Sequence, residues 1–525
     1  MSTALPPGSL RLAELVASLS LATDLGTGQP MDHALRVCHL STELGSQLGM
    51  DDQECADIFY ISLLRAIGCV SDAHLIAQRF GDELLAYAHI ALMDVTQPRE
   101  MLDLLLRHVG QGQPVLRRAR MIGAALAAGP GERNETIRAH CEVAERLARR
   151  LGMREEVAIG VGQVYERWDG KGSPGQRQGE QIMRAARVVI LARDAELFSR
   201  VDGPESAARM IRERSGTFYD PEVAERFCRD TRSLLRLLDT DAWEAVLAAE
   251  PGPRPVLMPT MRDRATRAIA DFVDLKSPFT TGHSSGVARL AEAAGLSLGF
   301  SETDASVLRQ AAYLHDLGRV AISARIWETA GPLTASDWEQ VRLHPYYTER
   351  ILARAPSLAG VASIAAQHHE RLDGSGYFRG VPGTMLSMPT RLLAAADVYH
   401  AMVERRPHRP AHTPEEAAAQ LQQELRAGRL DPDAVNAVLS AAGHQNSQVR
   451  RVWPMGLSDR EVEVLQLVVD GLTNREMGSR LGISQKTVGH HIQHIYNKVG
   501  VSTRAAATLF AMQHDLLIDP PIAGA

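Results

Sequence analysis

Apolar residues recur every three to four positions through most of this chain. In one well-defined segment the apolar positions are Val287, Leu290, Ala291, Ala294 and Leu298. Such a stripe is typical of an amphipathic helix that buries one face. Alternation with a period of two, which would indicate strands, is not sustained over several segments. The pattern therefore predicts an all-α fold.

Two stretches interrupt the helical pattern. Glu250–Pro259 carries four prolines in ten residues, and proline stops helices and favours extended backbone. The polar stretch 443–456 has no apolar period. A chain of 525 residues has room for three or four domains. We therefore place domains at 1–249, 261–442 and 457–525, with linkers at 250–260 and 443–456.

The first two domains repeat one another. His33 aligns with His283, a difference of 250, and the same register relates the later strings LLRAIG and YLHDLG. A register that holds across separated blocks indicates the tandem duplication of an α-helical domain. We call the two domains the first copy and the second copy.

The register changes once along the repeat. His140 aligns with His344, a difference of 204, and the strings ERWDGKG and ERLDGSG keep that difference. The differences of 250 and 204 imply 46 additional residues in the first copy. We predict this insertion between about Asp72 and Ala139.

The second copy carries histidines and aspartates that packing alone does not explain. A His-Asp pair inside an apolar helix is costly unless it has a partner. Imidazole nitrogens and carboxylate oxygens suit Fe, Mn, Zn or similar divalent ions, and an aspartate beside a histidine can bridge two of them. Two such ions can activate a water and hold a phosphoryl group. The candidate ligands are His283, His315, Asp316, His344, His368, His369 and Asp397. The isolated histidines are interpreted as ordinary core or surface residues: His400, His408, His412 and His444.

Five strings carry a resemblance to a known family: KSPFTTGHSSGVA, LHDLGRVAI, LHPYYTERIL, HHERLDGSGYFRGVPG and AAADVYHAM. The stretch 261–439 resembles the HD-GYP branch of the HD phosphohydrolase superfamily. The resemblance implies an all-α domain that holds two, sometimes three, Fe or Mn ions and hydrolyses cyclic dinucleotides, above all cyclic di-GMP. It implies that the seven candidates are metal ligands and that Asp316 bridges the ions. It also implies catalytic roles for His315, Asp316 and Arg319. Substrate contacts are implied for Arg319, Asp373, Gly376 and Tyr377.

The second copy departs from the family pattern at positions that are not ligands. Arg319 replaces a lysine, so a fork-shaped guanidinium stands where a compact ammonium is usual. Phe378 replaces the proline of the GYP motif, in a loop that helps to place the substrate. Phe279 stands where trinuclear members have a glutamate, which favours two ions. The positions of a family glycine and aspartate are taken by Thr348 and His400.

The first copy keeps three of the seven ligand positions, as His33, His140 and Asp194. Arg65-Ala66 stands in place of the His-Asp pair, and Val164-Tyr165 in place of the two adjacent histidines. Without a bridging carboxylate a binuclear site cannot form, so we predict a scaffold or sensor. The segment Asp169–Gly172 is interpreted as a turn whose glycines supply positive φ. A retained nucleotide pocket is the alternative.

The C-terminal segment 457–517 predicts four short helices. Ser458 and Glu461 form a capping box, and no acidic residue lies between Ser484 and Val499. A helix without acids suits the major groove of DNA. The alternative is a four-helix packing module with surface histidines. The segment resembles the LuxR-type (GerE-like) helix-turn-helix domain, which implies binding to duplex DNA, usually as a homodimer. The resemblance implies DNA contacts by Lys486, Thr487, His490, Gln493 and Lys498, and a core face formed by Val488, Ile492 and Ile495.

Composition limits the remaining choices. The net charge is −6, from 57 Lys+Arg and 63 Asp+Glu, so any nucleic-acid contact is local. The five cysteines form no CxxC pair and are predicted to be reduced, mostly buried thiols. We find no signal peptide and no apolar run of the ~18–20 residues that a membrane span needs. A cytoplasmic protein without a membrane partner is expected.

These expectations combine into a transcription regulator with two divalent ions, Fe or Mn, that hydrolyses cyclic di-GMP or a related phosphodiester. The first alternative is a domain that binds a cyclic nucleotide with little or no turnover and so controls DNA binding. The second is a structural role for both repeats as dimerisation arms. Metal content separates the second alternative from the others, and turnover separates the first two.

Overall fold

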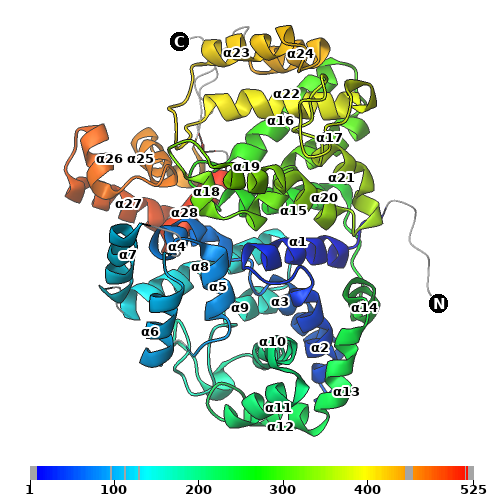
Figure 1. Ribbon diagram of the computed structural model, residues 1–525, viewed down its shortest axis with the longest axis vertical. Helices are drawn as coiled ribbons and strands as arrows, with labels where there is room; N and C mark the ends of the chain where they lie inside the picture. Colours follow the sequence, from blue (N-terminus) through cyan, green and yellow to red (C-terminus); the bar gives the residue numbers. More distant parts are fainter. Residues whose placement is uncertain are drawn as a thin grey trace. The chain divides into compact units, whose positions relative to one another are not determined.

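All regular elements of the described chain are helices. The computed structural model describes residues 9–94, 97–110, 114–127, 130–443, 453–514 and 516–517. Within these ranges β pairing is limited to isolated bridges, so the predicted all-α fold is confirmed (Figure 1). The chain divides into two compact units, Met1–Ala265 with Arg354–Ser357 and Thr266–Ala353 with Leu358–Ala525.

The two copies begin with matching helices. Helices α2 (His33–Gln47) and α16 (His283–Ser297) each span 15 residues and start at the aligned histidine. Helices α3 (Asp52–Leu64) and α17 (Glu302–Leu314) each span 13 residues. In both copies the two helices pack against each other. The difference of 250 is kept throughout, which confirms this part of the predicted register.

A backbone contact confirms the second part of the register. A Cβ on Gly68 would lie 2.1 Å from the carbonyl oxygen of His140. In the second copy, a Cβ on Gly318 would lie 2.0 Å from the carbonyl oxygen of His344. The two glycines differ by 250 residues and the two histidines by 204. Because the same contact forms in both copies, both differences hold in the structure. Only glycine fits such a close approach.

The predicted insertion of the first copy forms helices of its own. Between η1 (Cys69–Asp72) and α8 (Pro130–Arg150) lie α4 (Ala73–Phe80), α5 (Glu83–Ile90), α6 (Pro98–Arg107) and α7 (Val115–Ala127). In the second copy, the interval between η4 (Leu317–Ala321) and α20 (His344–Leu352) contains α18 (Ala324–Trp327) and α19 (Ala335–Arg342).

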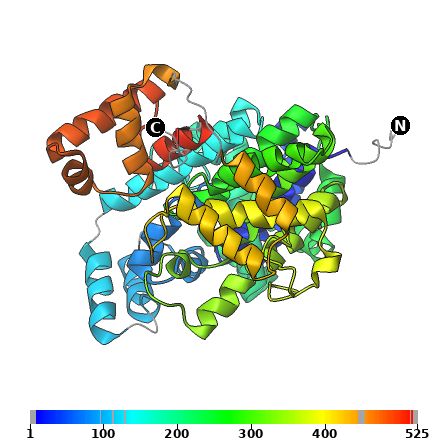
Figure 2. The ribbon, with the colours of Figure 1, turned by 90° about the horizontal axis from the view of Figure 1, so that it is seen from above.

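A long helix near the end of each copy carries the last ligand position. In the first copy this is α10 (Arg184–Asp202), which packs against α2; in the second it is α22 (Met388–Val403), which packs against α16. Helices α23 (Pro414–Arg426) and α24 (Pro432–Ala441) then pack on α22 (Figures 1 and 2). The other helices are α1 (Leu12–Gly26), α9 (Glu155–Val161), α11 (Pro204–Glu213), α12 (Pro221–Arg229), α13 (Thr231–Arg236), α14 (Ala242–Ala249), α15 (Pro259–Asp274) and α21 (Ala359–Ala365).

One stretch meets the length and composition of a membrane span, contrary to the expectation from the sequence. Asp52–Phe80 has a mean hydropathy of 1.3 over its best window. However, 83% of that window is buried inside the first copy, as in the core helix of a globular domain. The stretch is therefore weak evidence for a span. All five cysteines are free thiols and four of them are buried, as expected.

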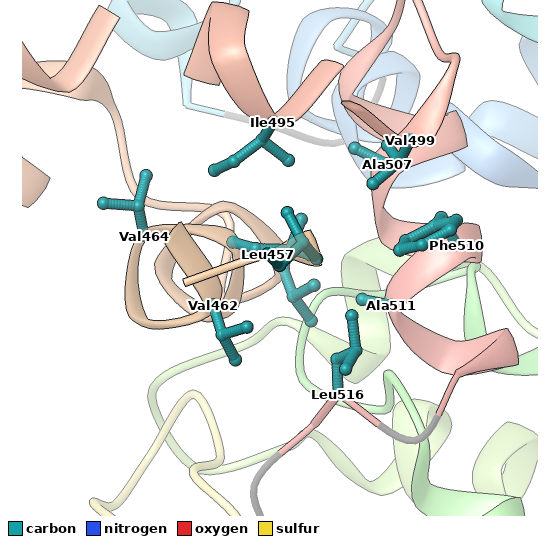
Figure 3. Close-up of a cluster of buried hydrophobic side chains, with 11 residues drawn as sticks. Leu457, Val462, Val464, Ile495, Val499, Ala507, Phe510, Ala511 and Leu516 are labelled. Carbon is teal, nitrogen blue, oxygen red and sulfur yellow. The ribbon is translucent and has the colours of Figure 1, made fainter. Parts of the chain in front are cut away.

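The C-terminal domain has the four predicted helices: α25 (Asp459–Val469), α26 (Asn474–Leu481), α27 (Gln485–Val499) and α28 (Arg504–Gln513). Ser458 and Glu461 form the expected capping box at the start of α25. The core includes Ile495, Phe510 and Leu516 (Figure 3). Of the predicted core face, Val488 and Ile495 are buried and Ile492 is partly buried against them. This face of α27 is therefore confirmed, and its opposite face is exposed.

Candidate functional site

The seven candidate ligands come together in the second copy. Six of them are buried, and His369 is partly exposed. They come from the starts of α16 and α20, from the segments that follow α17 and α21, and from the middle of α22. Among the groups whose ligand atoms lie within 4.8 Å of one another, two share no residue: His283, His315 and Asp397, and His344, His368 and His369.

Asp316 lies between these two groups. Its Oδ2 is 3.3 Å from Nε2 of His315 and 3.6 Å from Nε2 of His283. Its Oδ1 is 3.4 Å from Nε2 of His344 and 3.6 Å from Nε2 of His368. Each oxygen therefore faces its own pair of histidines. One carboxylate in this position can serve two ions at once.

Three of the histidines are oriented by their own backbone. The acceptor is in each case the carbonyl oxygen three residues earlier. For His315 the distance from Nδ1 is 2.7 Å, for His344 it is 2.6 Å and for His368 it is 2.7 Å. A carbonyl oxygen can only accept, so Nδ1 of each ring carries the proton. Nε2 is then the free ligand atom, and it faces the centre, as in other metal-binding histidines.

The protonation states suit cation binding. Burial lowers the pKa of His344 to about 3 and also lowers the pKa of His368 and of His369. Burial alone would raise the pKa of the Asp316 carboxyl, but Arg319 and neighbouring imidazoles hold it well below its usual range. The group of His344, His368 and His369 thus offers neutral imidazoles at neutral pH, beside the ionised carboxylate of Asp316.

An orphaned atom supports the assignment of this centre to a metal. Nε2 of His315 is buried and has no hydrogen-bond partner among the described residues. Such an atom is expected to have a partner that completes its environment. A set of imidazole nitrogens and two carboxylates suits divalent Fe, Mn or Zn. The residues present therefore fit divalent ions.

Arg319 lies directly beside the centre. Its Nη1 donates to Oδ2 of Asp316 at 2.7 Å. The guanidinium carbon lies 4.2 Å from the centroid of the Trp327 ring, a cation–π contact. The sequence placed a cation next to the His-Asp pair, but it did not indicate that the central carboxylate would be its partner.

The glycine-rich loop brings Tyr377 to the centre. The centroid of its ring lies 4.6 Å from that of His369 and 6.2 Å from that of His344. Gly376 allows the loop to cross itself, because a Cβ there would lie 2.4 Å from Cα of Glu370. Two of the predicted substrate-contact residues thus shape or line the site.

Asp373 and Phe378 face other neighbours. The exposed Asp373 accepts hydrogen bonds from the backbone nitrogen and the hydroxyl of Ser375, at 2.9 and 2.6 Å. Phe378, in place of the motif proline, packs edge-on against Tyr346 with centroids 5.6 Å apart. Within the part of the chain that the structure describes, these contacts turn both side chains toward neighbours other than the seven candidate ligands.

A buried glutamate that the sequence analysis did not single out shapes this loop. Glu370 accepts from the backbone nitrogens of Arg379 at 2.9 Å and Val381 at 3.1 Å. Its aligned residue Glu166 accepts from the backbone nitrogen of Gln176 at 2.9 Å. The signal was available, because this glutamate begins the string that both copies share.

The retained ligand positions of the first copy all have internal partners. Nδ1 of His33 lies 2.5 Å from Glu196, and Nε2 of His140 lies 2.5 Å from Asp72. Asp194 accepts from the hydroxyl of Tyr219 at 2.7 Å and pairs with Arg193, the residue that the difference of 204 aligns with Asp397, so Asp194 lies one residue beyond that position.

The D-G-x-G segment of the first copy is a turn, but its two glycines act differently. Gly170 has a φ of +74°, and its counterpart Gly374 has a φ of +77°. Gly172 does not have a positive φ, so this part of the interpretation was wrong. A Cβ there would lie 2.4 Å from the backbone nitrogen of Arg167. The second glycine is needed for close backbone approach, as in the second copy.

The exposed face of α27 holds four of the five predicted DNA contacts. Lys486, Thr487, His490 and Gln493 are exposed along it. Lys498 is engaged within the domain, because its Nζ lies 2.7 Å from Oε2 of Glu461 and donates to the carbonyl of Gly456 at 2.9 Å. That engagement disfavours a DNA contact by Lys498.

Comparison with known proteins identifies the family to which the chain belongs. A profile described as "HD domain" matches 128–223 and 267–434, which lie in both copies. The 3'3'-cGAMP-specific phosphodiesterase 3 of Vibrio cholerae is 33% identical over 434 residues, 82% of this chain and 94% of the relative. The chain belongs to the HD-GYP family. A solved cyclic GMP-AMP-specific phosphodiesterase of V. cholerae (V-cGAP3) is 27% identical, with a TM-score of 0.57 over 83% of this chain and 99% of that chain.

A further relative and a further profile complete the comparison. The cyclic di-GMP phosphodiesterase response regulator RpfG of Xanthomonas campestris is 36% identical over 164 residues, 30% of this chain and 43% of the relative. A profile described as "Bacterial regulatory proteins, luxR family" matches 455–511. This HD-GYP protein therefore carries a LuxR-type DNA-binding domain at 455–511.

Proposed function

We propose that the second copy hydrolyses a cyclic dinucleotide and that the same chain binds duplex DNA as a transcription regulator. The observation that carries the enzymatic part is the place of Asp316, with each oxygen facing its own group of histidines. The relatives named for cyclic GMP-AMP and cyclic di-GMP support a cyclic dinucleotide as the substrate class.

The proposed roles follow from the geometry. His283, His315 and Asp397 would hold one ion and His344, His368 and His369 a second, with Asp316 placed to serve both. Two divalent ions bound there, Fe or Mn, would activate a water and stabilise the charge of the phosphodiester. Arg319 lies where it can offset negative charge on the phosphate, and Tyr377 bounds the site against the ligand histidines. His315 and Asp316 are the catalytic pair of this proposal.

The proposed setting completes this function. We expect a homodimer in the cytoplasm that contacts DNA through Lys486, Thr487, His490 and Gln493, which are exposed on α27. LuxR-type helix-turn-helix domains place their recognition helix in the major groove, and paired half-sites mirror the symmetry of a dimer.

A second candidate function is a sensor that binds the nucleotide with little or no turnover. The observation in its favour is the 2.7 Å ion pair between Arg319 and Asp316. The guanidinium occupies the same oxygen that faces His283 and His315, so it competes with a cation at that position. Phe378 also favours the sensor, because it replaces the motif proline in the loop that helps to place the substrate, and its ring packs against Tyr346.

Product analysis separates the two candidates. Purified protein is loaded anaerobically with Fe or Mn and incubated with cyclic di-GMP and, separately, with 3',3'-cyclic GMP-AMP. The products are resolved by chromatography. The Asp316→Ala variant is assayed in the same way as the unmodified protein, and Asp202→Ala, at an exposed position, is the matched control. Linear product that disappears only in Asp316→Ala supports the enzyme. Bound metal without product from either substrate contradicts it and leaves the sensor.

The DNA-binding part has an independent test. Anisotropy titrations with a fluorescent 30-base-pair duplex of random sequence, over a range of salt concentrations, measure the phosphate contacts. Lys486→Ala is expected to weaken binding and to reduce the slope of log affinity against log salt by about 1. Lys498→Ala is expected to leave that slope unchanged, because its ammonium already pairs with Glu461. Equal slopes for Lys486→Ala and the unmodified chain would remove Lys486 from the interface.

A further inference from the structure

One ligand of the centre is oriented differently from the other buried histidines. His315, His344 and His368 each donate from Nδ1 to a carbonyl of their own helix or turn. His283 differs, although it begins α16 just as His344 begins α20. The carbonyl three residues earlier, that of Thr280, accepts the backbone nitrogen of His283 at 3.0 Å instead. The imidazole of His283 needs an acceptor from elsewhere.

Glu404 supplies that acceptor. Its Oε2 lies 3.0 Å from Nδ1 of His283, while Oδ1 of Asp397 lies 3.1 Å from Nε2 of the same ring. Glu404 is the C-cap that follows α22, seven residues or about two helical turns after Asp397, so both side chains reach α16.

Two further residues hold Glu404 in place. Arg406 donates to Oε2 of Glu404 at 2.6 Å and to the carbonyl of Phe279, in the loop before His283, at 3.2 Å. Nδ1 of His400 lies 3.0 Å from Oε1 of Glu404. His400 fits there because its ring lies over Gly286, where a Cβ would meet Nε2. From the sequence, His400 was predicted to be an ordinary core or surface residue, but its place beside Glu404 gives it a specific role.

The first copy also places a carboxylate on Nδ1 of its first histidine, but the carboxylate comes from a different position along the chain. Nδ1 of His33, aligned with His283, lies 2.5 Å from Glu196. Glu196 follows Asp194 by two residues on α10, whereas Glu404 follows Asp397 by seven. Each copy thus places a carboxylate of its long helix on Nδ1 of the first histidine. The agreement of two different solutions shows that the contact is not an accident of one helix register.

We propose that Glu404 is a positioning residue that fixes the tautomer and direction of His283, so that Nε2 points to the ion shared with His315 and Asp397. His400 and Arg406 orient Glu404. A carboxylate behind a ligating histidine raises its basicity and fixes its ring, and removing such partners weakens metal affinity about 10–100-fold in metalloproteins. The inference rests on the metal centre of the proposed function but not on turnover.

The competing explanation is a third ion. His283, His400 and Glu404 form a group of ligand atoms within 4.8 Å of one another. Two contacts disfavour it. Oε2 of Glu404 is already paired with Arg406, so its charge is balanced, and Nε2 of His283 faces Asp397 and Asp316 rather than this group. A ligand role predicts that any loss of the carboxylate removes one ion. A positioning role predicts that ions stay and bind more weakly.

Anaerobic Mn(II) titration by calorimetry, with bound metal counted by mass spectrometry, tests the proposal. Glu404→Gln keeps an acceptor for Nδ1 and Glu404→Leu removes it. The expected result is unchanged stoichiometry at saturation, with affinity for one ion reduced about 10–100-fold in Glu404→Leu and less in Glu404→Gln. The exposed Glu339→Gln on α19 is the matched control and should bind as the unmodified chain does. Equal losses in Gln and Leu with one ion fewer overturn the proposal in favour of a third ion.

A double-mutant cycle separates positioning from a general effect on folding. In a His283→Ala background, Glu404→Leu is expected to reduce Mn(II) affinity no further, because its effect passes through that imidazole. Additive effects would show that Glu404 acts only through the fold. Unchanged affinity in Glu404→Leu overturns the proposal directly, and so does an unmodified chain that binds no metal. Bound metal without turnover overturns the proposed enzyme alone and leaves the role of Glu404 intact.

Discussion

The two HD-type copies share one scaffold and differ in what satisfies the ligand positions that both retain. In the second copy, Nε2 of His344 faces Asp316 and His368, within the ligand set. In the first copy, the same nitrogen of His140 lies 2.5 Å from Asp72. Asp72 also accepts from the hydroxyl of Tyr87, at 3.1 Å. The same position in the fold therefore belongs to the candidate metal centre in one copy and to an internal ion pair in the other.

The partners of the first copy come from outside the motif positions. Tyr87 lies on α5, inside the inserted segment, and Tyr219 reaches Asp194 from beyond α11. Arg65, which aligns with His315, brings a fixed buried cation whose Nη2 lies 3.7 Å from Asp24. A copy that lacks most of the ligand positions must still provide partners for the buried polar groups that remain. In the first copy, Glu196 and Asp72 pair with the two retained histidines, and Tyr219 and Arg193 pair with Asp194.

The largest expected effect sets His344→Ala against His140→Ala. His344→Ala is expected to reduce turnover and Mn(II) affinity by more than about 100-fold, because even outer partners of a metal ligand are worth about 10–100-fold. His140→Ala should leave both nearly unchanged and instead destabilise the first copy by about 3–5 kcal/mol, since Asp72 loses its buried ion-pair partner. Both variants are compared by their turnover, their metal affinity and the calorimetric melting of the metal-free protein. Loss of turnover in His140→Ala would contradict the proposal that the second copy alone carries the residues needed for turnover.

A smaller effect tests whether the scaffold is really the same. Gly68→Ala and Gly318→Ala are expected to destabilise their copies to a similar extent, about 1–3 kcal/mol each, because each added Cβ would lie within 2.1 Å of a carbonyl oxygen. The matched control is Gly360→Ala on α21, where nothing lies within 4 Å. Calorimetric melting temperatures measure the comparison. Tolerance of alanine at one position only would show that the two copies pack differently there.

The residues that local strings carry could be predicted from the sequence. The seven ligand positions, the two registers and the buried face of α27 all follow from short strings or from helical spacing, and the structure brings them together as expected. The partners of those residues could not be predicted. Glu404, Glu196 and Asp72 stand at no shared spacing from the histidines that they hold, because side chains from several helix positions can reach one imidazole. The pairing of Lys498 with Glu461 was missed for the same reason: both stand on helices whose contact depends on tertiary packing.

The smallest expected effect is a pH dependence at an aligned pair of buried aspartates. Asp24 accepts from the backbone nitrogen of Ala34 at 2.7 Å, and Asp274 accepts from that of Ser284 at 2.9 Å. Burial raises the pKa of Asp24 to about 8 and that of Asp274 to about 7. Both aspartates hold the start of the helix that begins with the first histidine, in the copy with ligands and in the copy without.

The sign of the effect follows from proton binding. Between the unfolded pKa of Asp24, about 4, and its folded pKa, about 8, the folded state holds a proton that the unfolded state releases. The free energy of unfolding therefore falls as pH rises through this window, by at most about 1.4 kcal/mol per pH unit from this group. Asp24→Asn cannot ionise and keeps an acceptor for Ala34, so its melting temperature relative to the unmodified chain should rise from pH 5 to pH 8. The exposed Asp202→Asn should show no such trend. A constant difference for Asp24→Asn would mean that Asp24 is ionised in the fold, and the equivalence of the two aspartates as neutral helix supports would then fail.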